Sequence, residues 1–197
     1  MGNKTFPLIA SRGMTLELIE AIKGRRSIRS YKPDPVPMEI IRDILEAGIW
    51  APSAKNGQQW RFTVLTGKAK DDYNEMFRAS LDRFIEKKGR DQAGSAPFTL
   101  EIMEEAPVLV IVWNTAEGGW ITEEHSVAAA IQNICLRAHD LGLGSLWIGD
   151  VFYAYEETRE YFNKEWKLSG AVALGYASVD PKIPNRKSLD KVAEFLQ

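Results

Sequence analysis

Three arginines stand within five positions near the start of the chain, in the stretch KGRRSIRSYKPDPVP at residues 23–37: Arg25, Arg26 and Arg29. A guanidinium group can bind two phosphate oxygens at once, and the Ser27 hydroxyl could complete such a site. In an extended segment, Arg25, Ser27 and Arg29 would point to one side and Arg26 to the other. The pattern favours an anion site, with a solvated basic turn as the alternative.

Other residues with reactive side chains offer less. Cys135 lies in the apolar run AAAIQNICLRA, which favours a buried thiol over a nucleophile. Together with His125 and His139, it lacks the spacing of metal ligands, so we expect no metal. We expect Asp150 to be structural or exposed rather than an acid–base group.

The composition excludes several classes of protein. The 197 residues can bury a sizeable core, and a net charge of −2 argues against general nucleic-acid binding. No apolar run is long enough to span a membrane, and the N-terminal residues do not resemble a signal peptide. A single cysteine fits a reducing compartment, so we expect a cytoplasmic protein without nucleic-acid or membrane partners.

The positions of apolar residues, glycines and prolines predict an α+β domain in which helices flank a mixed sheet. The longest helix should be buried nearly all round, whereas residues 68–88 should form an exposed helix and residues 89–97 a loop. Predicted helices cover residues 15–24, 36–50, 68–88, 122–141 and 154–165, and predicted strands cover 61–67, 106–113, 145–150 and 168–177.

Four motifs follow one another along the chain: RRSIRSY at 25–31, APSAKNGQQWRF at 51–62, GLGSLWIGD at 142–150 and LGYASVDPKIPNRKSL at 174–189. Each motif is weak alone, but the ordered set resembles the nitroreductase family of FMN-dependent oxidoreductases. The resemblance spans residues 15–195. Gln59 departs from the family pattern, which commonly has proline before the tryptophan.

The resemblance implies which residues contact FMN. Those that match the phosphate and ribityl positions are Arg25, Ser27 and Arg29, and Arg26 would reach the ribityl chain or the ring. Arg186 and Lys187 would join the phosphate from the far end of the chain. Those that match the segment meeting the flavin ring across a dimer interface are Pro52, Ser53, Ala54 and Asn56. Those that would run along the ring are Trp147, Ile148 and Gly149. Phe98 and Trp120 are candidates for the substrate pocket.

The resemblance also implies an activity. FMN would take hydride from NADH or NADPH and pass it to a small acceptor, such as a nitroaromatic or a quinone, by a ping-pong mechanism. No catalytic side chain is expected, because the flavin carries the chemistry. The family fold is a mostly antiparallel sheet flanked by helices in an intertwined homodimer. The 197 residues would form one domain, with an extension at 1–14 and a tail at 180–197 that contacts the partner.

Three alternatives stay open at this point. A flavin carrier or sensor would keep the arginine motif but lack nicotinamide turnover. A specialised flavin enzyme would dehalogenate aromatics or fragment the flavin itself. A protein without flavin would use its arginines for another phosphorylated ligand.

Overall fold

The computed structural model describes residues 16–196, so the expected extension at 1–14 lies outside the described residues. The helices are α1 (Leu18–Gly24), α2 (Met38–Ile49), α3 (Gly67–Lys88), α4 (Ala96–Glu105), α5 (Ile121–Asp140) and α6 (Tyr155–Tyr161). The strands are β1 (Trp60–Thr66), β2 (Val108–Asn114), β3 (Gly144–Ile148) and β4 (Lys167–Gly175). Short 3-10 turns, η1 to η4, lie at Ala54–Asn56, Arg90–Ala93, Asp150–Ala154 and Leu189–Lys191.

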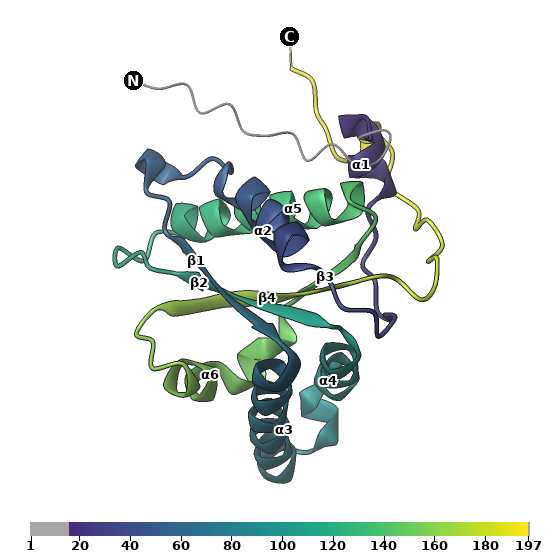
Figure 1. Ribbon diagram of the computed structural model, residues 1–197. Coiled ribbons are helices and arrows are strands. Elements are labelled where there is room, and N and C mark those ends of the chain that lie inside the picture. Colours follow the sequence, from purple (N-terminus) through teal and green to yellow (C-terminus); the bar gives the residue numbers. More distant parts are fainter. Residues whose placement is uncertain (1–15, 197) are drawn as a thin grey trace, which may run out of the picture.

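The strands form an antiparallel sheet in the order β1-β2-β4-β3, in which Val110 of β2 lies between Val64 and Val172. Helices α2 and α5 cover one face, and α3, α4 and α6 cover the other (Figure 1). All seven residues of β2 are buried, because helices pack on both of its faces. This arrangement confirms the predicted α+β class and a mostly antiparallel sheet.

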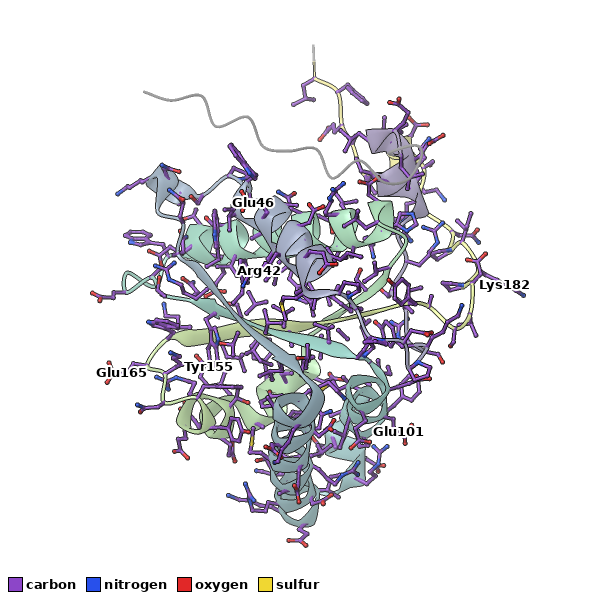
Figure 2. The ribbon with its side chains drawn as sticks, in the orientation of Figure 1. Arg42, Glu46, Glu101, Tyr155, Glu165 and Lys182 are labelled. Carbon is purple, nitrogen blue, oxygen red and sulfur yellow. The ribbon has the colours of Figure 1, made fainter. Side chains whose placement is uncertain are left out.

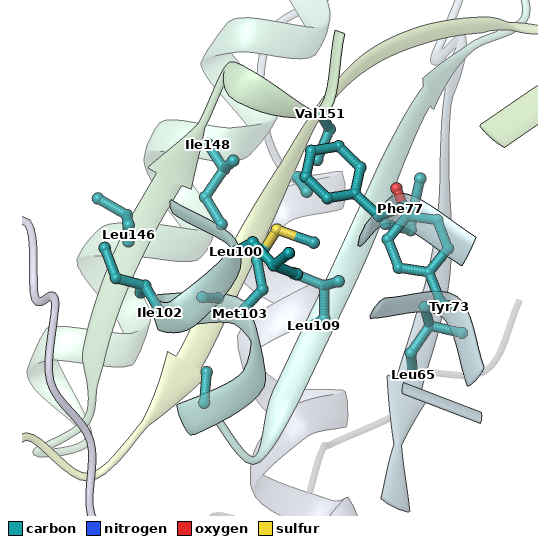
Figure 3. Packing of buried hydrophobic residues seen from close by; sticks show 14 of the residues in the cluster. Leu65, Tyr73, Phe77, Leu100, Ile102, Met103, Leu109, Leu146, Ile148 and Val151 are labelled. Atoms are coloured by element: carbon teal, nitrogen blue, oxygen red, sulfur yellow. The ribbon is translucent and has the colours of Figure 1, made fainter. Parts of the chain in front are cut away.

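Alternate residues of β2 supply two separate hydrophobic cores. Val108, Val110 and Val112 pack with α2 and α5, whereas Leu109, Ile111 and Trp113 pack with α3 and α4. Figure 3 shows the second core, in which Leu100 and Met103 of α4 lie against Leu109. The continuous apolar run at 106–113 is therefore explained by burial on both sides.

The second core corrects two expectations. Residues 89–97 are not only a loop, because α4 begins at Ala96 and buries Leu100 and Met103. Helix α3 is not simply exposed, because Tyr73 and Phe77 are fully buried. The Lys70 ammonium group donates to the carbonyl oxygens of Met103 and Glu104, at 3.3 and 2.9 Å, and so ties α3 to the end of α4.

Helix α5 lies across the sheet and ends at a glycine. Gly142 has φ of +78°, and the Leu143 amide donates to the Ala138 carbonyl, which closes the helix end. Within one chain, α5 is not buried all round, because one stripe of the helix remains uncovered. That stripe of exposed or half-buried residues is Ile121, His125, Ala128, Gln132, Leu136 and His139.

The arginine stretch runs beside the sheet rather than free in solvent. Ser27 forms a parallel bridge with Ser145 of β3, and the Ile28 amide donates to the Ser145 carbonyl at 2.9 Å. Tyr31 forms an antiparallel bridge with Ala177, just beyond β4. The residues after α1 are thereby fixed against the ends of β3 and β4.

Within residues 16–196, none of the helices combines the length and the apolar character that a membrane span requires.

Replacing Phe77 tests the second core. We expect Phe77→Ala to lower the free energy of unfolding by about 3–5 kcal/mol, because it empties a fully buried site. Asp82→Ala, on the exposed side of the same helix, should change it by less than about 0.5 kcal/mol. Urea denaturation measures both; a small effect of Phe77→Ala would contradict the buried placement of α3.

Candidate functional site

A cavity of about 370 Å³ lies where the arginine stretch meets the C-terminal end of α5 and the start of β3. Its polar lining includes Arg25, Arg26, Lys32, His139, Ser145 and Ser178. Residues after β4, including Asp180 and Pro181, complete the wall. Basic side chains of the arginine stretch therefore meet polar side chains from distant parts of the sequence around one cavity.

Three buried polar atoms at this cavity have no hydrogen-bond partner among the described residues: Arg25 Nε, Arg26 Nε and Ser145 Oγ. The rest of the Arg26 guanidinium is partly satisfied, since Nη1 donates to the carbonyls of Lys23 and Arg25 at 2.5 and 2.7 Å. Leaving buried donors unpaired costs free energy, and a charged donor costs more than a neutral one. The cavity is thus suited to an anion that accepts several hydrogen bonds.

The electrostatic environment at His139 agrees with this. Burial, followed by the charges of Arg26 and Arg25, lowers the pKa of His139 below its usual range, while Asp140 opposes the shift. The imidazole is therefore neutral near pH 7, and the two arginines carry the local positive charge.

The arginines do not alternate as an extended segment would. Arg25 caps the end of α1, and both Arg25 and Arg26 line the cavity. Ser27 and Arg29 lie outside the lining; Arg29 is exposed and donates only a long bond of 3.4 Å to the Ser27 carbonyl. Lys32, His139 and Ser145 also line the cavity but were not predicted. Lys32 lies in the arginine stretch itself, whereas nothing in the residues around His139 or Ser145 signals an anion site.

The segment at the end of β3 places its three candidate residues differently. Trp147 is 44% exposed, Ile148 is buried and Gly149 is exposed. Asp150 accepts hydrogen bonds from Ser95 and Thr99 at the start of α4, at 2.8 and 2.5 Å. That carboxylate is engaged in holding α4, which agrees with the structural interpretation.

The loop with the second motif lies elsewhere, beside the N-terminal end of α5. The Ala54 amide donates to Ser126 Oγ at 3.0 Å, and Pro52, Ser53 and Asn56 lie on or near the surface. This loop and Trp120 line a second cavity of about 530 Å³. The two cavities stand at opposite ends of α5, whose 20 residues span about 30 Å.

The remaining candidates are exposed. Arg186 and Lys187 lie on the C-terminal segment, where Arg186 donates only to its neighbour Asn185 at 3.4 Å. Figure 2 shows Lys182 on the same segment, at the outer edge of the molecule. Phe98 is exposed on α4, on the opposite face of the sheet from Trp120, so one chain does not bring these two together. Their contacts with a ligand stay predictions.

Comparison with known proteins identifies relatives. The model of the Nitroreductase family matches residues 22–176. A Methanothermobacter thermautotrophicus protein, provisionally named NADH dehydrogenase/NAD(P)H nitroreductase, is 31% identical over 89% of this chain and 88% of its own. The 5,6-dimethylbenzimidazole synthase of Rhodospirillum rubrum is 27% identical over 84% of each chain.

Solved structures agree with this relationship. A nitroreductase with bound FMN from Bacteroides fragilis superposes with a TM-score of 0.73, at 29% identity over 93% of this chain and all of its own. A BluB-like flavoprotein from Clostridium difficile gives 0.79, at 25% identity over 92% of this chain and all of its own.

Gly144 provides a test of how the arginine stretch is seated. A β-carbon at this position would lie 2.6–2.9 Å from three Ile28 atoms, so Gly144→Ala should push residues 27–28 away from β3. We expect a loss of about 1–3 kcal/mol in the free energy of unfolding. Gly149→Ala, where no atom lies within 4 Å, should cost less than about 0.5 kcal/mol. Equal losses of unfolding free energy for the two variants in denaturant titrations would contradict the close contact between Ile28 and Gly144.

Proposed function

Because this chain belongs to the nitroreductase family, we propose that it is an FMN-dependent oxidoreductase that uses NADH or NADPH to reduce a small acceptor, such as a nitroaromatic or a quinone. Bound FMN would supply the hydride chemistry, with donor and acceptor taking turns at one site. The names of the relatives support this proposal, since they include an NAD(P)H nitroreductase and an FMN-bound structure.

The observation that carries the proposal is the set of unpaired buried atoms, Arg25 Nε, Arg26 Nε and Ser145 Oγ, around one cavity. These donors lack hydrogen-bond acceptors. A phosphate offers several acceptor oxygens, and its two negative charges complement the arginines. Arg25 and Arg26 would hold the phosphate, and Ser27 and Arg29 the adjoining ribityl chain. Arg186 and Lys187 would join from the C-terminal segment.

The segment after β3 would form the wall beside the flavin ring. Trp147 would supply an exposed indole, and the backbone of Ile148 and Gly149 would face the ring. Asp150 is not needed as an acid, because Ser95 and Thr99 hold it. The protein therefore binds and orients the reactants, and no side chain is assigned a catalytic step.

We further propose that two chains form the complete site. Pro52, Ser53, Ala54 and Asn56 lie about 30 Å along α5 from the arginine cavity, too far to contact one flavin from within a single chain. A second copy packed on the exposed stripe of α5 would bring its own loop to this cavity. The tail at 180–197 carries exposed Leu189, Val192 and Phe195, which a partner could cover.

A specialised flavin reaction is the second candidate. The similarity to 5,6-dimethylbenzimidazole synthase and to a BluB-like flavoprotein supports it. A flavin carrier without turnover would use the same arginine cavity. Reduction of bound flavin by NADH or NADPH distinguishes these alternatives from the reductase.

We place the protein in the cytoplasm. Its single thiol, Cys135, is free and buried. Burial raises the pKa of this thiol, and the charge of Arg25 opposes that shift. An unpaired buried cysteine is typical of a reducing compartment.

Loss of Arg25 should weaken cofactor binding. We expect Arg25→Gln to raise the FMN dissociation constant about tenfold to a hundredfold, because it removes a charged hydrogen-bond donor to the phosphate. Arg42→Gln is the control, since Arg42 is exposed on α2 (Figure 2). Quenching of FMN fluorescence measures both. Unchanged affinity in Arg25→Gln would contradict the phosphate assignment.

A charge on the exposed stripe of α5 should separate the two chains. We expect Leu136→Arg to shift the protein from dimer to monomer in sedimentation velocity, because it buries an unpaired charge in the interface. Glu101→Arg changes an exposed residue of α4, on the opposite face of the sheet, and this variant should remain dimeric. A monomeric wild-type protein would refute the proposed assembly.

A further inference from the structure

His139 lines the arginine cavity but has no role in the function proposed above. It lies in the last turn of α5 and shares the cavity wall with Arg25, Arg26 and Ser145. Among the described residues, burial and three nearby charges, rather than a hydrogen bond, determine the protonation of its imidazole. The ring therefore has a nitrogen available for a ligand.

Gly24, the last residue of α1, defines where this ring lies. A β-carbon at Gly24 would stand 2.5 Å from His139 Nε2 and 3.4 Å from the ring carbons Cδ2 and Cε1. The Nε2 edge of the imidazole therefore points toward the space that the missing side chain leaves free. Gly24 lines the same cavity, so Nε2 lies at the cavity wall, where an imidazolium N–H could donate to an anion.

The charges contributed by other elements disfavour a proton on His139 in the free protein. Arg25, Arg26 and Lys32 of the arginine stretch share the cavity with it, against the single carboxylate of Asp180. Burial, followed by the charges of Arg26 and Arg25, lowers the pKa of His139. A third cation is therefore excluded from the empty site near pH 7.

The one opposing charge on its own helix is already paired. Asp140 favours a proton on His139, but its Oδ1 atom accepts from the Leu16 amide at 3.0 Å. Its Oδ2 atom forms an ion pair with Arg137. This carboxylate is thus engaged elsewhere, and a proton on His139 requires a negative charge from outside the chain.

A phosphate dianion in the cavity reverses this balance. Its two negative charges offset those of Arg25 and Arg26, and an opposite charge within about 4–6 Å favours the charged form of a histidine. The C-terminal end of a helix also favours a cation, and His139 lies in the last turn of α5. The occupied site can therefore hold the cation that the empty site excludes.

We propose that His139 is a further anion-binding residue, which takes up a proton when a phosphate enters the arginine cavity and then donates from Nε2 to a phosphate oxygen. The proton comes from solvent, and the N–H bond is the only covalent bond that forms. For FMN this inference rests on the proposed function. The coupling itself applies to any dianion in the cavity, because it depends on charge and not on the flavin.

Proton uptake on FMN binding tests the inference. At pH 7.5 the phosphate of FMN is already almost wholly a dianion, because the second pKa of a phosphate monoester is about 6. Any protons taken up must then come to the protein. We expect uptake of about half a proton or more per FMN, measured by calorimetry in two buffers that differ in ionisation enthalpy.

Replacing the imidazole should remove this uptake. His139→Gln keeps a hydrogen-bond donor but cannot take up a proton, so uptake should fall to nearly zero. The FMN dissociation constant should rise about threefold to tenfold. Arg42→Gln, which changes an exposed residue of α2, should keep the uptake of the wild-type protein. Uptake that persists in His139→Gln would overturn the inference.

Sulfate distinguishes this inference from the proposed function, since it is a dianion whose charge does not change near neutral pH. In NMR titrations of the FMN-free protein, sulfate should raise the pKa of His139 relative to chloride at equal ionic strength. The His139 signal is the one that His139→Gln lacks. A raised pKa without FMN binding would support the role of His139 and contradict the cofactor assignment. FMN that binds without proton uptake would refute the role of His139 and leave the cofactor assignment intact. Both wild-type measurements stand even if His139→Gln fails to fold.

Discussion

The site depends on one close backbone contact, between the arginine stretch and the first residues of β3. The Ile28 amide donates to the Ser145 carbonyl, and the missing side chain of Gly144 leaves room for Ile28. This contact places Arg25 and Arg26 in the same cavity as Ser145 and joins a segment near the N-terminus to the edge strand β3. Arg25 Nε, Arg26 Nε and Ser145 Oγ are thereby buried around one cavity, where they have no hydrogen-bond partner among the described residues.

Helix α5 sets the second constraint. The arginine cavity and the second cavity lie at opposite ends of this helix. His139, near the C-terminal end, lines the arginine cavity, and Trp120, just before the N-terminal end, lines the second cavity. A ligand the size of FMN cannot reach both from one chain. The stripe of half-buried residues along the same helix offers the surface through which a second chain would bring the opposite ends together.

Sequence reasoning predicted the parts of the fold that have a local signal. The apolar run at 106–113 predicted β2, and the glycines after Asp140 predicted where α5 ends. The start of helix α4 is not predicted, because Ser95, Ala96 and Pro97 are typical of loops. The apolar face of this helix is buried only through its packing against β2, which is distant from the residues that begin the helix. In the site, the basic motif predicts Arg25 and Arg26 as a pair, and both line the cavity, but their shared orientation depends on the end of α1. Ser145 and His139 cannot be predicted as cavity residues, because their neighbours in the sequence do not indicate that they pack near arginines more than a hundred residues away.

The central claim is that flavin held at the arginine cavity accepts hydride from a nicotinamide donor. The most direct measurement is the visible absorption spectrum of the FMN-loaded, desalted protein as NADH or NADPH is added without oxygen. The account predicts a flavin band that stays with the protein and bleaches on addition of at least one donor. A retained band that neither donor bleaches would contradict the reductase assignment, and the absence of any retained flavin would contradict the assignment of the cavity itself.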